Sequence, residues 1–199
     1  TGYGTIQANR SAPFHYGDKV RIWANASVNS TFTVFTGSLT GTESPQDLTI
    51  DGNKAVDAGF TLNTYTLTLT KSGTGFGTIQ ANRSAPFHYG DKVRIWANAS
   101  LNSTFTVFTG GLTGSTTPQD LTIDDNKAVD AAFSLNTYTL TLTKSGTGFG
   151  TIQANRSAPF HYGDKVRIWA NASLNSTFTA FTGGLTGSTT PQDLTIDDN

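Results

Sequence analysis

The sequence predicts an all-β protein made of tandem repeats of 73 residues, arranged as a rigid rod. The segment GTIQANRSAPFHYGDKVRIWANAS begins at Gly4, again at Gly77 and again at Gly150, so the copies are offset by a constant 73 residues. Short runs alternate apolar and polar residues with a period of two, are rich in Thr and aromatic residues, and are separated by Gly, Asn and Asp. No segment shows a helical period.

The middle copy is expected to contain about six strands, because it offers six such runs. In the first run Tyr65, Leu67 and Leu69 alternate with threonines, which gives one apolar face and one hydroxyl-rich face. The last two runs flank Asp124, Asp125 and Asn126, a turn-forming cluster that predicts a hairpin. The expected strands are Thr64–Lys71, Phe76–Asn82, Lys92–Asn98, Thr104–Thr109, Leu121–Ile123 and Ala128–Phe133.

The repeats are expected to follow one another without a flexible linker. Only three residues separate Phe133 from the next alternating run, which begins at Thr137. The phase of the repeat predicts repeat 1 over 1–62 without its first strand, a complete repeat 2 over 63–135, and repeat 3 over 136–199 without its last strand. Because an absent strand uncovers a core and a sheet edge, the polypeptide is expected to continue at both ends.

Composition excludes several classes of partner and site. The formal net charge is −1 and the basic residues are scattered, so no nucleic acid and no anionic membrane surface is expected as a partner. No apolar run approaches the roughly 18 residues of a membrane-spanning helix, so no membrane span is expected in this segment. The chain has no cysteine, which excludes disulfides, thiol catalysis and cysteine metal sites.

The order of apolar residues and glycines in each copy is similar to that of a known family. The residues that carry the resemblance are Tyr65, Leu67, Leu69, Gly73, Gly75, Gly77, Tyr89, Gly90, Val93, Ile95, Ala97, Phe105, Phe108, Gly110, Leu112, Gly114, Pro118, Leu121, Ile123, Asp124, Asn126, Lys127, Val129 and Phe133. They resemble the divergent internalin B-type bacterial repeat, a short β-rich module found in tandem in surface and secreted proteins, and the similarity covers all three copies. The sequence departs from the family where Phe35, Phe108 and Phe181 replace a usual Trp and where Ser38 or Gly111 replaces an acidic residue.

The resemblance implies a small β-grasp-like or β-sandwich-like module that serves as a spacer, stalk or adhesive unit. It implies no catalytic residues. Each candidate group is also copied three times on a scaffold of turns and Thr-lined strands, whereas an enzyme needs one preorganised site. The sequence therefore predicts a protein that is not an enzyme and that needs no cofactor.

Each repeat carries three candidate N-glycosylation sequons. Composition alone gives roughly one sequon per repeat by chance, so three is a modest excess. Glycosylation would place the chain outside the cell. The candidate asparagines are Asn9, Asn25, Asn29, Asn82, Asn98, Asn102, Asn155, Asn171 and Asn175.

A tryptophan on the polar face of one strand is the candidate contact surface. Trp96 is expected on the same face as Arg94 and Asn98, opposite Val93 and Ile95. Such an aromatic either stacks on a sugar or packs against a neighbouring repeat or chain, and packing is the favoured interpretation. The surface comprises Trp23, Trp96 and Trp169 with Arg21, Arg94 and Arg167.

Three other features could suggest catalysis, metal binding or crosslinking, but each has a simpler explanation. A histidine and an aspartate three residues apart, first at His15 and Asp18, have the spacing of a tight turn, and one imidazole per repeat is too few for a zinc site. The acidic cluster at Asp124 lacks the twelve-residue calcium-loop pattern. Lys54 and Lys71 could join asparagines in isopeptide bonds, but the sequence holds no specific signal for this.

The sequence therefore predicts the structural repeat region of an extracellular filament, sheath or cell-surface stalk that self-associates through repeat contacts. Its expected partners are copies of itself and, in second place, glycans. One alternative is a multivalent adhesin or carbohydrate-binding module that uses the three tryptophans and gains avidity from their even spacing. Another is an accessory domain of a hydrolase.

Overall fold

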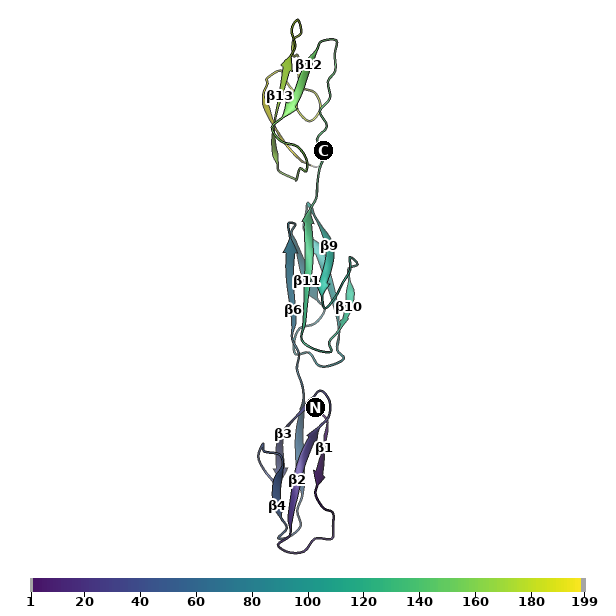
Figure 1. Ribbon diagram of the computed structural model, residues 1–199, viewed down its shortest axis with the longest axis vertical. Coiled ribbons are helices and arrows are strands. Elements are labelled where there is room, and N and C mark those ends of the chain that lie inside the picture. The colour runs from purple at the N-terminus through teal and green to yellow at the C-terminus, as the bar shows by residue number, and fades with distance from the viewer. Residues whose placement is uncertain (1, 198–199) are drawn as a thin grey trace.

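Three β-rich units follow one another along a single long axis (Figure 1). The computed structural model describes residues 2–197, so the outermost residues of the first and third predicted repeats lie outside the described part. Each unit has a hydrophobic cluster of its own, formed within residues 20–58, 65–133 and 138–196. The long axis therefore carries three separate small cores and no shared one.

The middle unit is a sandwich of two three-stranded sheets around one core. One sheet has the order β10-β8-β7 and the other the order β6-β11-β9. Side chains from both sheets meet in the same cluster, among them Val93 and Ile95 of β8 and Val129 and Phe133 of β11. The strands are β6 (Leu67–Gly73), β7 (Gly77–Ala81), β8 (Lys92–Ala99), β9 (Ser103–Gly110), β10 (Gln119–Thr122) and β11 (Lys127–Leu135).

The predicted alternation on the third expected strand is confirmed in β8. Val93 and Ile95 are fully buried, whereas Lys92 and Arg94 between them are exposed. Because successive side chains of a strand point to opposite faces, this pattern fixes which face of the sheet covers the core. Trp96 falls on the outer face, as predicted, and is half-buried there.

The strand β11 is the centre of its sheet and pairs on both sides. It pairs in parallel with β6, from Lys127 opposite Leu67 to Phe133 opposite Gly73, and antiparallel with β9. The backbone of Gly77 lies against this strand, because a Cβ added there would be 2.3 Å from a ring carbon of Phe133. Glycine at this position lets β7 approach the Phe133 ring closely.

The predicted hairpin of the last two strands is wrong. Strand β10 pairs with β8, and β11 pairs with β6 and β9, so the two strands belong to different sheets. The polar segment between them crosses from one sheet to the other. There Asn126 Oδ1 accepts a hydrogen bond from the amide of Thr66 at 2.9 Å, and Asp124 forms an ion pair with Lys127. These turn residues therefore tie the crossover to β6 and β11 instead of closing a two-residue hairpin loop.

The first unit repeats this architecture with a two-stranded second sheet. Its sheets have the orders β1-β2-β4 and β3-β5. The strands are β1 (Gly4–Ala8), β2 (Lys19–Ala26), β3 (Ser30–Gly37), β4 (Gln46–Thr49) and β5 (Val56–Leu62).

The third unit has one complete sheet, of order β12-β13-β14. Its strands are β12 (Gly150–Ala154), β13 (Lys165–Ala172) and β14 (Gln192–Thr195). Residues 140–146 and 176–183, the counterparts of β6 and β9, form no named strand here. In the middle unit both of those strands pair with β11.

The prediction of an all-β tandem-repeat protein is confirmed, with small sheets in every unit and no helix in residues 2–197. Accordingly, that part of the chain offers no helix with the length and hydropathy needed to cross a membrane.

Candidate functional site: the junctions between units

The connection between the first and middle units is two residues long and hydrogen-bonded. Strand β5 ends at Leu62, and after Asn63 and Thr64 the next unit begins at Tyr65. The amide of Asn63 donates to the carbonyl of Asn29 at 2.9 Å. The hydroxyl of Thr31 donates to Asn63 Oδ1 at 2.7 Å. The connecting segment is therefore attached at two points, to the turn between β2 and β3 through Asn29 and to the start of β3 through Thr31.

Tyr65 bridges the two units. Its backbone amide donates to the carbonyl of Phe87 in the middle unit at 2.9 Å. Its hydroxyl donates to Oδ1 of Asn29 in the first unit at 3.0 Å. Asn29 has a φ of 62°, a left-handed conformation that Asn tolerates better than most residues, and this turn points its side chain at the following unit.

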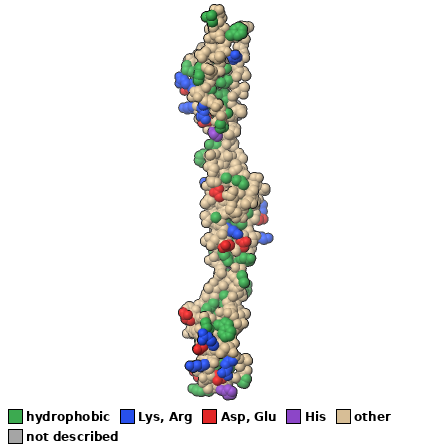
Figure 2. Space-filling view, in the orientation of Figure 1, with side chains coloured by type: hydrophobic (Ala, Val, Ile, Leu, Met, Phe, Trp, Pro, Cys, Tyr) green, Lys and Arg blue, Asp and Glu red, His purple; other side chains and the backbone are tan. Residues whose placement is uncertain are grey.

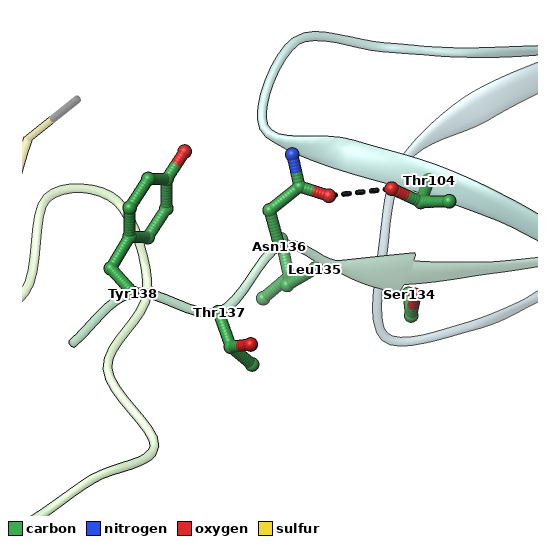
Figure 3. Close-up of a pocket in the computed structure, with 6 residues that line it drawn as sticks. All are labelled: Thr104, Ser134, Leu135, Asn136, Thr137 and Tyr138. Carbon is green, nitrogen blue, oxygen red and sulfur yellow. Dashed lines mark hydrogen bonds between the residues drawn. The ribbon is translucent and has the colours of Figure 1, made fainter.

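The junction between the middle and third units repeats the same contacts (Figure 3). The amide of Asn136 donates to the carbonyl of Asn102 at 2.9 Å, and the hydroxyl of Thr104 donates to Asn136 Oδ1 at 2.7 Å. The amide of Tyr138 donates to Phe160 at 2.9 Å, and its hydroxyl donates to Asn102 Oδ1 at 3.1 Å. The close-up shows the residues that line an open hollow at this junction, with the Tyr138 ring on one side and Asn136, bonded to Thr104, on the other.

The two junctions have consequences for shape rather than for chemistry. A connection of two residues leaves few free backbone torsions, and each hydrogen bond between units opposes rotation about those that remain. The tyrosine and the asparagines that make the contact recur at both junctions, so the two junctions are held by the same bonds. We call this set of contacts, made by Asn29, Asn63 and Tyr65 or by Asn102, Asn136 and Tyr138, the junction latch.

The predicted tryptophan surface lies away from the junction latch, on the outer face of the first sheet of each unit. Trp23 stands opposite Gln7 in the β1-β2 ladder and donates from Nε1 to its side-chain oxygen at 2.9 Å. Trp96 and Trp169 repeat this bond at 3.0 and 2.9 Å. All three tryptophans are half-buried. Their contact with another molecule stays a prediction.

The predicted arginines lie on the same strands as the tryptophans, and each pairs with an aspartate across the sheet. The nitrogen-to-oxygen distances are 3.5 Å for Arg21 and Asp47, 3.3 Å for Arg94 and Asp120, and 3.7 Å for Arg167 and Asp193. Both partners are more than half exposed in every pair, so these pairs contribute little to stability. Each pair places opposite charges side by side on the outer face of the sheet.

The three classes of sequon occupy different places. Asn9, Asn82 and Asn155 are exposed, and their Oδ1 atoms accept from the amides of the arginines on the neighbouring strand at 3.0, 2.9 and 2.9 Å. Asn25, Asn98 and Asn171 are exposed near the ends of β2, β8 and β13. Asn29 and Asn102 are half-buried in the junction latches, and Asn175 is exposed. Glycosylation of any of them stays a prediction.

The histidine and aspartate motif forms the tight turn that its spacing predicts. The amide of His88 donates to Asp91 Oδ2 at 2.8 Å, and the amide of Asp91 donates back to the carbonyl of His88 at 3.1 Å. The first of these bonds is the main reason that the pKa of Asp91 lies below its ordinary value. Desolvation raises this pKa, and the nearby Arg83 guanidinium lowers it. Among residues 2–197 no group of three potential metal ligands converges.

Sequence reasoning missed the junction latch and a set of exposed apolar side chains. The latch was hidden because Tyr65 reads as the first apolar residue of an alternating strand, and its hydroxyl contact to Asn29 joins residues 36 positions apart. The exposed apolar residues left a signal in the sequence. Leu101 stands in a turn beside Asn102 and Ser103, where polar residues are the rule.

Fold and junctions together define a class: a tandem-repeat protein in which small β-sandwich-like units are joined end to end by short hydrogen-bonded connections. A family model described as the divergent InlB B-repeat domain matches residues 1–64 and 65–137. The chain belongs to this family, as the resemblance predicted, and proteins of the InlB type of repeat are found on bacterial surfaces. No curated protein and no solved structure matches the chain significantly.

Proposed function

We propose that the chain is a structural repeat region of an extracellular filament, sheath or cell-surface stalk, whose copies associate through contacts between repeats. The observation that carries the proposal is the junction latch, which recurs with the same partners at both junctions. A protein whose units are held in line by their connections is suited to spanning distance. Membership of a repeat family of surface proteins points to a role that is not enzymatic.

The proposal includes the division of the chain into repeats over 1–62, 63–135 and 136–199. Its support is the position of the connections. Asn63 and Asn136 each follow the last strand of one unit, and Tyr65 and Tyr138 each bond to the unit that follows. Each predicted boundary therefore falls at a latch and not inside a sheet.

Electron microscopy of the 199-residue chain at rising concentration tests this function. The proposal predicts elongated particles whose long dimension contains evenly spaced units and which associate into longer or thicker fibres. A chain that stays monomeric up to millimolar concentration would contradict self-association. Compact particles would contradict the structural role as a whole.

A second candidate function is a multivalent adhesin or carbohydrate-binding module. The observation that favours it is the fixed tryptophan on the outer face of each unit, held by a glutamine and flanked by an arginine and aspartate pair. A ring of fixed orientation is a suitable platform for a sugar. Substitution of Trp23, Trp96 and Trp169 by Ala tests it, because loss of binding to a polysaccharide with assembly unchanged would support adhesion.

A further inference from the structure

Each unit exposes large aromatic or aliphatic side chains at three recurring positions, of which one is Tyr16, Tyr89 or Tyr162 and the other two lie close together. In the middle unit Phe76 is 67% exposed and Leu101 is 84% exposed. The counterparts are Tyr3 and Val28 at 67% and 88%, and Phe149 and Leu174 at 77% and 91%. We call these the apolar pairs. Single exposed apolar residues are common on proteins, but here the same exposure recurs in every unit.

The two members of each pair are neighbours in space. The amide of Ser100, the residue before Leu101, donates to the carbonyl of Phe76 at 2.9 Å. The equivalent bonds, from Ser27 to Tyr3 and from Ser173 to Phe149, measure 2.8 and 2.9 Å. The turn that carries Leu101 also carries Asn102 of the junction latch. The apolar pairs of the first two units therefore lie at the end of the unit that faces the next unit along the rod, and the third pair lies at the corresponding end of its unit.

Neither the core nor the latch explains these side chains. The apolar pairs are absent from all three hydrophobic clusters, and the latch uses hydroxyl, amide and carbonyl groups. The first and second copies differ at nine positions, and two of these are the members of the pair. Tyr3 becomes Phe76 and Val28 becomes Leu101, so one position stays aromatic and the other stays aliphatic.

We infer that the apolar pairs form a lateral contact surface that binds a second copy of this chain, rod beside rod. The inference rests on the proposed function, in which copies associate, and it names the surface that they use. The pairs recur once per repeat along the rod, so a partner that covers all of them must present complementary groups at the same spacing. A second copy does so by construction. The net charge of −1 gives little repulsion between copies.

Other ligands fit the apolar pairs less well. The aliphatic member offers no flat face on which a sugar ring could stack. Basic side chains, which draw a protein to an anionic membrane, are spread along all three units in the view of Figure 2. Hydrophobic side chains also appear on the surface of all three units in that view.

The size of one pair requires that several act together. An aromatic side chain buries about 150–250 Å² when fully covered, whereas a stable interface covers on the order of 1,000 Å² or more. One apolar pair is therefore too small to hold two copies together. Pairs on one rod that meet the same partner add their contributions, because the first contact raises the effective concentration of the others. Association is thus expected to strengthen steeply with the number of repeats.

Serine substitution of all six residues tests the lateral surface in solution. We expect the variant Tyr3→Ser, Val28→Ser, Phe76→Ser, Leu101→Ser, Phe149→Ser and Leu174→Ser to keep its fold, because each site is at least two-thirds exposed. Its dissociation constant for lateral dimers, measured by analytical ultracentrifugation, should rise by about 100-fold or more. The matched control replaces three exposed tyrosines at the opposite end of β2, β8 and β13 by Ser, namely Tyr16, Tyr89 and Tyr162. It should leave the dissociation constant of the lateral dimer unchanged.

Cysteine crosslinking tests the geometry, since the chain has no cysteine of its own. Leu101→Cys leaves the pairs of the first and third units intact and should give a disulfide-linked dimer under mild oxidation. Thr109→Cys, on an exposed site of β9, should give at least about tenfold less, because a disulfide needs Cα atoms within about 7 Å. Equal crosslinking at both sites would overturn the lateral surface. Undiminished association of the six-serine variant would also overturn the lateral surface, but the proposed self-association would stand. A wild-type chain that never associates would overturn both the lateral surface and the proposed self-association.

Discussion

Removal of one hydroxyl from the first junction should loosen the rod without unfolding it. In Tyr65→Phe the ring and the backbone bond to Phe87 remain, and only the hydrogen bond from the hydroxyl to Asn29 is lost. A neutral hydrogen bond contributes a net free energy of about 1 kcal/mol. The equilibrium between latched and unlatched junctions should therefore shift about fivefold toward the unlatched form, since 1.4 kcal/mol corresponds to a factor of ten.

Replacement of the acceptor should have the same effect. Asn29→Gly removes the side chain, and glycine accepts the φ of 62° without steric cost. The double variant with Tyr65→Phe should be no looser than the more affected single variant, because both changes remove one and the same bond. Asn175→Gly is the matched control, since it alters the same turn in the third unit, beyond both junctions.

Spin labels across the junction measure this equilibrium. Thr49→Cys on β4 and Thr122→Cys on β10 give one exposed label in each of the first two units, and no native cysteine interferes. Pulsed electron paramagnetic resonance should give one narrow distance peak in the parent chain and a broader distribution in Tyr65→Phe. Identical distributions in the two proteins would refute the role of the hydroxyl, and a broad distribution in the parent would refute the latch itself.

Two further predictions concern the stability of single units. Gly77→Ala should lower the free energy of unfolding, measured by chemical denaturation, by about 2 kcal/mol, because the new Cβ would lie 2.3 Å from the Phe133 ring. In the control Gly111→Ala the new Cβ meets its nearest neighbour at 3.4 Å, so the loss of stability should be far smaller. Because the amide of His88 lowers the pKa of Asp91 below 3.8, this carboxylate stabilises the fold fully above pH 3.8, and the contribution disappears as the pH falls through the lower folded-state value. Urea midpoints at pH 7 and pH 3 should therefore differ less in Asp91→Asn than in the parent chain, and an equal difference would contradict the assignment.

Local patterns in the sequence were enough to place the strands and their faces. Val93 and Ile95 alternate with charged residues, and this alone identified the buried face of β8. The pairing of strands was beyond such patterns. β6 and β11 pair in parallel although Leu67 and Lys127 are 60 positions apart, and no local signal reports a contact of that span. The wrong hairpin has the same origin, because a turn cluster does not reveal which sheet each flanking strand joins.

The contact surface illustrates a second limit of sequence reasoning. Trp96 drew attention as a large aromatic among polar residues, but it is half-buried and its indole nitrogen bonds to Gln80 of the same unit. Leu101 is 84% exposed, yet an ordinary leucine beside a turn attracts little notice. The exposure of a side chain depends on which parts of the folded chain cover it, and a local sequence pattern does not report this.

Small-angle X-ray scattering of the dilute monomeric chain tests the central claim most directly. If the junction latches hold the units in line, the pair-distance distribution should have the single peak and long tail of a rod and should match the curve calculated from the structure in Figure 1. A distribution with a shorter maximum dimension, fitted only by an ensemble of bent arrangements, would contradict the account.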